Sequence, residues 1–220
     1  MALCKYPTWA FVSVLLIFSS PESETADITE VITKPASPSY AVEGKNITLE
    51  WTYTLDGSVG SAKFAIANDG GEKVIGKIFS PGIINVKPEY QERFKVEVTN
   101  TSVVVEILAV QRSDEEIYKV NILPTGDGSI LEEVILVVNF PPIIEEISGN
   151  QTVTEGGNVT LKCLAVGKPM PNITWTRLSD NSVVDMTLTD IGRQDSGKYR
   201  CNAKNGIGGS ATGDVWIVVQ

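Results

Sequence analysis

The chain has 220 residues, of which 42% are hydrophobic and 20% charged, so it can form one large domain or two of about 100 residues each and is too apolar for wholesale disorder. Its formal charge of −9 argues against binding to the phosphate backbone of nucleic acids. It contains no histidine, which excludes Ser-His-Asp and Cys-His nucleophile systems and every zinc site that needs an imidazole.

Residues 1–20 have the pattern of a secretory signal peptide. The basic Lys5 precedes an apolar run of about ten residues, and small residues follow it at Ser19 and Ser20. A buried strand or helix is the alternative, but the run is too short to cross a membrane, and no second long apolar stretch follows it. We therefore predict a secreted, extracellular chain without a membrane span, either a two-domain protein or the front of a longer membrane protein.

Five Asn-x-Ser/Thr sequons support secretion. Such sequons are acceptors for N-linked glycans, which are bulky and are attached at exposed positions. We expect a glycoprotein in which most of these sites are modified. The five asparagines are Asn46, Asn100, Asn150, Asn158 and Asn172.

An internal repeat spans the rest of the chain. Residues 43–51 (EGKNITLEW) align without a gap with residues 155–163 (EGGNVTLKC). Residues 112–121 (RSDEEIYKVN) align in the same way with residues 193–202 (RQDSGKYRCN). Two homologous modules are the economical interpretation, and repeats of this kind indicate repeated structural units.

The two copies differ in their cysteines. Cys163 and Cys201 are the two cysteines that remain once residues 1–20 are removed, and one disulfide is their simplest explanation in a secreted chain. The first copy has Trp51 and Val120 at the matching positions.

Both modules have the patterns of β-structure. Apolar residues alternate with polar ones through residues 47–53, 103–107 and 159–163. Tight-turn signals such as Asp56-Gly57 and Asp127-Gly128 separate these runs. We predict an all-β chain of short strands packed as sandwiches.

The second module, about residues 141–220, contains a cysteine–tryptophan–cysteine pattern. Trp175 follows Cys163 by twelve positions, and Asp195-x-Gly-x-Tyr199-x-Cys201 follows it. This pattern resembles an I-set or C2-type domain of the immunoglobulin superfamily. The resemblance implies an inter-sheet disulfide with Trp175 packed on it, and a tyrosine corner formed by Tyr199 next to Asp195.

The first module, about residues 27–140, resembles a V-set immunoglobulin domain that lacks the disulfide. Its landmarks are 69 positions apart instead of 38, and residues 72–79 provide an additional strand. The resemblance implies that Arg93 pairs with Asp114, that Tyr118 takes the tyrosine-corner position, and that Trp51 and Val120 fill the volume of the missing bridge.

The modules meet at Pro141-Pro142, directly after an apolar run. Proline fixes φ, so a strand that runs into two prolines leaves almost no flexible linker. We predict two immunoglobulin-like β-sandwiches in tandem after the signal peptide, arranged as a semi-rigid rod.

No residue pattern supports catalysis, a cofactor or a metal site. The acidic doublets lack the Asp-rich loop of a calcium site, and alternation places their members on opposite faces of a strand. The resemblance implies a binding surface, most often the sheet formed here by segments near 61–67, 72–79, 116–122 and 130–137, which contain no sequon. We expect a non-enzymatic recognition or cell-adhesion module that binds a protein or a second copy of itself. The alternative is a secreted structural matrix component of the hemicentin type.

Overall fold

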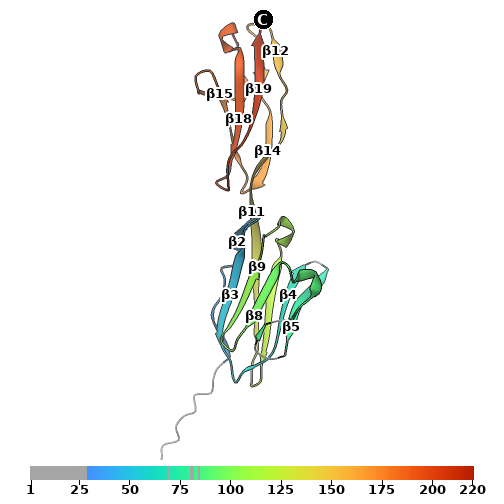
Figure 1. Cartoon of the computed structure of the whole chain (residues 1–220). Helices are drawn as coiled ribbons and strands as arrows, with labels where there is room; N and C mark the ends of the chain where they lie inside the picture. The colour runs from blue at the N-terminus through green and yellow to red at the C-terminus, as the bar shows by residue number, and fades with distance from the viewer. Residues whose placement is uncertain (1–28, 69, 80–81, 84) are drawn as a thin grey trace, which may run out of the picture.

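The computed structural model describes residues 29–68, 70–79, 82–83 and 85–220, and the predicted signal peptide lies outside them. The described residues form two β-sandwiches placed end to end (Figure 1). Helical structure among them consists of three 3-10 turns: Pro88–Tyr90, Arg112–Asp114 and Arg193–Asp195. The prediction of an all-β chain is confirmed.

The first sheet of module one has five strands in the order β1-β3-β9-β8-β6. Alternation is clearest in β3, where Leu49, Trp51 and Tyr53 are buried and the residues between them are not. Such a period of two is what a strand with one covered face requires. The strands are β1 (Glu30–Thr33), β3 (Ile47–Thr54), β9 (Ser102–Ile107), β8 (Phe94–Val98) and β6 (Gly82–Ile83).

The second sheet of module one contains the four segments that the resemblance assigned to a contact face. Its order is β11-β10-β4-β5-β7, and β2 pairs with β11 in parallel. The added strand expected over residues 72–79 is β5. The strands are β2 (Ser39–Val42), β4 (Val59–Asn68), β5 (Gly71–Ile78), β7 (Asn85–Val86), β10 (Ile117–Pro124) and β11 (Ile130–Ile147).

Module two is built from fewer and shorter strands. Its five-stranded sheet has the order β12-β19-β18-β15-β16, and β13 pairs with β17. The strands are β12 (Gln151–Val153), β13 (Val159–Thr160), β14 (Cys163–Lys168), β15 (Asn172–Arg177), β16 (Val183–Val184), β17 (Thr187–Leu188), β18 (Gly197–Lys204) and β19 (Ala211–Val219).

Strand β11 belongs to both modules. It pairs with β10 through Ile135 to Ile130 and with β14 through Phe140 to Ile147, on both sides of Pro141-Pro142. The chain therefore crosses from one sandwich to the other without leaving extended structure, as Figure 1 shows between the two bodies.

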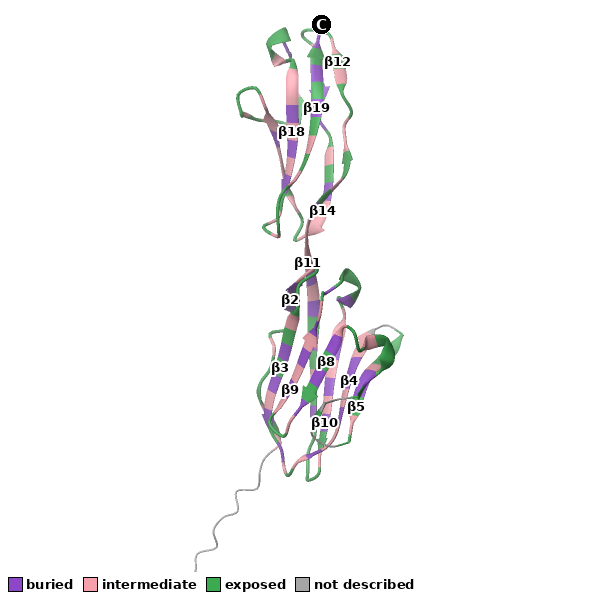
Figure 2. Cartoon of the chain, viewed as in Figure 1, coloured by how far each residue is buried: buried purple, intermediate pink, exposed green. Residues whose placement is uncertain are grey.

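Each sandwich has its own core. One cluster of buried residues runs from Ala41 to Val138 and the other from Val159 to Val219. Figure 2 shows the buried positions alternating with exposed ones along the strands of both modules. Because the two clusters share no residue, each module is stabilised mainly by its own hydrophobic burial.

Candidate functional site

Trp51 and Val120 lie in the core of module one, on opposite sheets. Trp51 is on β3 and Val120 on β10, and both are buried. Phe64 of β4 stacks on Tyr118 with ring centroids 5.8 Å apart, and Phe94 contacts both rings. In module one, aromatic rings and aliphatic side chains thus occupy the part of the core where module two has its disulfide.

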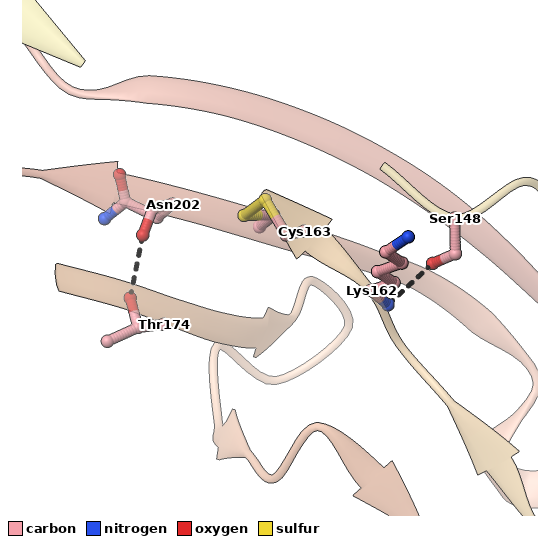
Figure 3. Close-up of a disulfide and its surroundings, with 6 residues drawn as sticks. Ser148, Lys162, Cys163, Thr174 and Asn202 are labelled. Atoms are coloured by element: carbon pink, nitrogen blue, oxygen red, sulfur yellow. Dashed lines mark hydrogen bonds between the residues drawn. A yellow bond between two sulfur atoms is a disulfide. The ribbon is translucent and has the colours of Figure 1, made fainter. Parts of the chain in front are cut away.

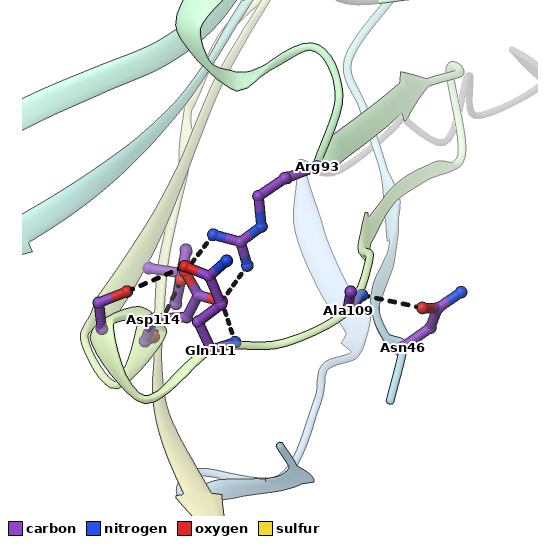
Figure 4. A network of polar contacts seen from close by, with 7 residues as sticks. Asn46, Arg93, Ala109, Gln111 and Asp114 are labelled. Atoms are coloured by element: carbon purple, nitrogen blue, oxygen red, sulfur yellow. Dashed lines mark hydrogen bonds and ion pairs between the residues drawn. The ribbon is translucent and has the colours of Figure 1, made fainter. Parts of the chain in front are cut away.

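Arg93 and Asp114 close one end of module one (Figure 4). Two guanidinium nitrogens of Arg93 donate to the two carboxylate oxygens of the buried Asp114, one at 3.0 Å. The same carboxylate accepts the backbone N–H of Gln111 at 2.7 Å, and the Tyr118 hydroxyl donates to the Asp114 carbonyl at 3.0 Å. These bonds hold the turn that leads into β10.

Module two has the same corner with a different arginine. The Tyr199 hydroxyl donates to the Asp195 carbonyl at 2.8 Å, and the Asp195 carboxylate accepts the Gly192 N–H at 3.0 Å. Its ion-pair partner is Arg177 at the end of β15, 3.1 Å away. The sequence comparison of the two copies missed Arg177, because it does not align with Arg93; its position two residues after Trp175 was the available signal.

The disulfide joins the two layers of module two (Figure 3). Cys163 is on β14 and Cys201 on β18, which belong to different sheets. Trp175 of β15 is buried and is the register partner of Cys201. The cysteine, tryptophan and tyrosine that the resemblance singled out therefore lie in one core.

All five sequon asparagines are exposed. Asn46 and Asn158, which are equivalent in the repeat, hold their side chains in the same way. The Asn46 carboxamide oxygen accepts the Ala109 N–H at 3.0 Å, and that of Asn158 accepts the Asp190 N–H at 3.2 Å. Ala109 and Asp190 both have left-handed backbone, with φ of 45° and 52°. The repeat thus extends to individual hydrogen bonds.

The outward side of the larger sheet of module one is the candidate site. Tyr118, Val120 and Ile122 of β10 point into the core, so Lys119 and its neighbours two residues away point outward. We call the outward side chains of β5, β4, β10 and β11 the β4–β10 face. Its main members are Lys63, Glu72, Lys77, Lys119, Asn121, Leu123, Leu131, Glu133 and Ile135.

The β4–β10 face combines exposed apolar groups with paired charges. Leu131 is 62% exposed and Ile135 is 46% exposed. Between them the Lys119 ammonium lies 2.5 Å from a Glu133 carboxylate oxygen, and this hydrogen bond raises the pKa of Lys119. A second pair, Lys63 with Glu72, is 2.6 Å apart. The face is thus close to neutral, although the chain is acidic.

Two shallow hollows flank these charges. One, of about 220 Å³, lies at one end between β4 and β5 and is lined by Lys63, Lys77 and Leu123. The other, of about 650 Å³, lies at the opposite end and is lined by Ile117, Ile135 and their neighbours. Hollows with apolar walls and a few polar groups can accept protruding side chains of a protein partner.

The sequons of module one lie in connecting segments at the ends of strands of the other sheet. Asn46 directly precedes β3, and Asn100 lies in the turn between β8 and β9, where its side-chain oxygen accepts the Val59 N–H at 3.0 Å. Glycans at these two positions would leave the β4–β10 face uncovered.

The junction between the modules contains contacts that the sequence did not indicate. The Lys168 ammonium donates to both carboxylate oxygens of Glu115 at 2.5 and 2.6 Å, and one of these oxygens also accepts the Val138 N–H. The pKa of Glu115 is lowered by the hydrogen bond from Lys168 and by that from Val138. The Asn205 amide donates to the Phe140 carbonyl at 2.9 Å. These bonds connect side chains of module two to the rim of module one and to the strand between the modules.

The described residues contain no group of three or more Cys, Asp or Glu side chains that could hold a metal ion. In the same part of the chain no helix has the length and apolar character needed to cross a membrane.

Comparison with protein families matches residues 141–205 to the immunoglobulin domain. Human IgLON family member 5 is 38% identical over 104 residues, which are 46% of this chain and 31% of that protein. The rat limbic system-associated membrane protein is 39% identical over 94 residues, 40% of this chain and 28% of that protein. These matches cover about a third of the length of each relative.

Among solved structures, the first two immunoglobulin domains of DIP-gamma superpose with a TM-score of 0.66 at 20% identity, over 87% of this chain and 97% of that one. The complex of Dpr11 with DIP-gamma gives 0.64 at 22% identity, over 88% and 99%. Titin domains I67–I69 give 0.65 at 18% identity, over 87% and 65%. The two sandwiches have the immunoglobulin fold, and residues 141–205 match the immunoglobulin domain family.

Proposed function

We propose that this chain is an extracellular recognition and cell-adhesion module that binds a protein partner through the β4–β10 face of module one. The observation that carries the proposal is the contrast between the two sides of that module. Hollows and paired charges occur on both sides, but both sequons of module one lie next to the β3–β9–β8 side, whereas exposed Leu131 and Ile135 lie on the other.

The composition of the face favours a protein partner over a small ligand. The hollows are shallow, and the exposed leucine and isoleucine lie on either side of a paired charge, a mixture of apolar and polar groups that protein interfaces use. The β4–β10 face has three lysines and two glutamates, so an acidic partner can approach it, and a second copy of this acidic chain is one such partner.

The relatives agree with a surface role. The limbic system-associated membrane protein is by its name a membrane protein, and Dpr11 and DIP-gamma, both immunoglobulin-domain proteins, bind each other in the solved complex. We propose that this chain likewise acts at the cell surface and has no catalytic role. The hemicentin-type matrix alternative has no support among the relatives reported above.

A glycan placed on the face tests the proposal. Glu133→Asn with Ile135→Thr creates a sequon on the outward side of β11 around the buried Val134, which stays unchanged. Lys95→Asn with Glu97→Thr creates the matched sequon on β8 of the opposite sheet, around the buried Val96. Both variants alter exposed residues only.

The secreted chain, displayed in multiple copies on beads, would be assayed for self-aggregation and for binding to a panel of cell surfaces. The glycan on β11 is expected to weaken binding at least tenfold, because it would block the contact face, and the glycan on β8 is expected to leave binding unchanged. Equal binding by both variants, or absence of any self-association and any cell-surface binding by the unmodified chain, would overturn the proposal.

A further inference from the structure

Module two exposes a tryptophan on the outer side of its sheet. Along β19 the residues Val215, Ile217 and Val219 point into the core and are buried. Trp216 and Val218 alternate with them, so they point to the other side of the sheet, and they are 52% and 45% exposed. Figure 2 shows buried and exposed positions alternating along β19. A half-exposed indole next to an exposed valine forms an apolar patch on the outer side of the sheet.

A sequon asparagine lies directly beside this patch. The Asn150 carboxamide oxygen accepts the backbone N–H of Trp216 at 2.9 Å. The carboxamide nitrogen, to which a glycan would be attached, is bonded to the same carbon and therefore lies within about 5 Å of the Trp216 nitrogen. The attachment point is thus fixed next to the residue that bears the exposed indole.

The strand register places the threonine of this sequon on the same side of the sheet as the indole. β12 runs parallel to β19, with Gln151 opposite Ile217 and Thr152 opposite Val218. Paired residues of neighbouring strands point to the same face, so Thr152 points outward with Val218, whereas Gln151 lies on the core side with Ile217. Asn150 directly precedes β12, and its side chain reaches the Trp216 backbone N–H at the edge of the sheet.

The other sequon asparagines whose side chains accept a backbone N–H do not bond to an aromatic residue. The carboxamide oxygens of Asn46, Asn100 and Asn158 accept N–H groups from Ala109, Val59 and Asp190, none of which is aromatic. Asn150 is thus distinguished from them by the aromatic residue that anchors its side chain.

We propose that an N-linked glycan on Asn150 folds back onto this patch, with its innermost N-acetylglucosamine covering Trp216 and Val218. The axial C–H bonds of a pyranose ring give it an apolar face, and the negative face of an indole attracts such weakly positive hydrogens. The inference concerns module two and does not depend on the proposed role of the β4–β10 face. Its consequence is that the outer side of β19 is covered by sugar and is closed to protein partners.

The tryptophans make the proposal measurable. Of the three in the described residues, Trp51 and Trp175 are buried in the two cores, so Trp216 dominates quenching of fluorescence by acrylamide. Trp9 lies in the predicted signal peptide. The full chain would be produced in a secreting eukaryotic host and compared with Thr152→Ala, which removes the sequon but keeps the Asn150 side chain. Thr160→Ala, which removes the Asn158 sequon, is the matched control.

The glycosylated chain is expected to have an acrylamide quenching constant at least twofold lower than that of Thr152→Ala, while Thr160→Ala equals the unmodified chain. Thr152→Ser keeps the sequon and should behave like the unmodified chain, which separates loss of the glycan from any effect of the side chain. Trimming the glycans to one sugar should preserve the protection, and complete removal should abolish it.

Three results would overturn the proposal. The first is equal quenching with and without the Asn150 sequon, and the second is absence of the glycan from Asn150 in glycopeptide mass spectrometry. The third is protection that rises with protein concentration in Thr152→Ala, because it would show that a second copy of the chain covers Trp216.

Discussion

Reduction of the disulfide is expected to destabilise module two and to leave module one unchanged. The Cys163–Cys201 bond closes a loop of 38 residues and is the one disulfide among the described residues. In the chain-entropy model, opening such a loop costs about 4 kcal/mol of folding free energy. A domain of this size has a total stability of about 5–10 kcal/mol, so reduction removes a large part of it.

The size of this change sets the expected signal. Since 1 kcal/mol shifts the melting temperature of a domain of this size by about 4–8 °C, the transition of module two should fall by more than about 15 °C in the reduced chain. Scanning calorimetry with and without reductant would resolve the two transitions. Amide hydrogen exchange of peptides around Tyr118 and Tyr199 would assign each transition to its module.

Trp51→Ala provides the reciprocal perturbation. Trp51 occupies the position of the first cysteine and is fully buried, so its truncation should cost module one about 3–5 kcal/mol, with or without reductant. The reasoning fails if reduction lowers the transition of module one as much as that of module two. Equal shifts would mean that the continuous strand β11 couples the two cores into one cooperative unit.

Asp114→Asn should lower the stability of module one by about 2 kcal/mol, because Arg93 then keeps a half-buried charge without its bidentate partner; an unchanged urea midpoint would contradict this. The pKa of Asp214 is depressed by the hydrogen bond from Arg200 and by that from a neighbouring lysine. The ion pairs of Asp214 therefore stabilise module two fully above the unfolded pKa near 4, and this stabilisation is lost as the pH falls further. Asp214→Asn should therefore weaken the dependence of the melting temperature of module two on pH below about 4, and an unchanged dependence would refute this. Ala109→Gly should raise the stability of module one by about 1 kcal/mol, since alanine is strained at a φ of 45°, and a lower melting temperature would show that this strain is absent.

The parts of the fold that the sequence predicts are those with a periodic or spaced signal. Alternation marks strands such as β3, and the gapless repeat relates the turn at Asp114 to that at Asp195. The spacing of Cys163 and Cys201 indicates their cross-link without any structure. Each of these features can be read from a short stretch of sequence, or from two short stretches that are each recognisable without the other.

The contacts that escaped prediction connect single polar residues of distant segments. Lys168 and Glu115 lie 53 positions apart on the rims of different modules, and neither is part of a periodic pattern. Arg112 lies with its guanidinium 3.8 Å from the centre of the Phe140 ring, a contact that depends on how β11 leaves module one. Trp216 is a large hydrophobic residue in an apolar run, so the sequence does not indicate that it is exposed. Its exposure follows from the structure, in which no described residue covers the outer side of the sheet at this position.

The path of β11 has a mechanical consequence. In module one it pairs in parallel with β2, near the N-terminal end of the described residues, and it then carries the covalent chain directly into module two. A pull along the long axis therefore loads the β2–β11 hydrogen bonds in shear, side by side, so that they must break together. In module two β12 and β19 are also parallel and repeat this arrangement. A chain that links two surfaces in this way transmits tension through its backbone before either core begins to open.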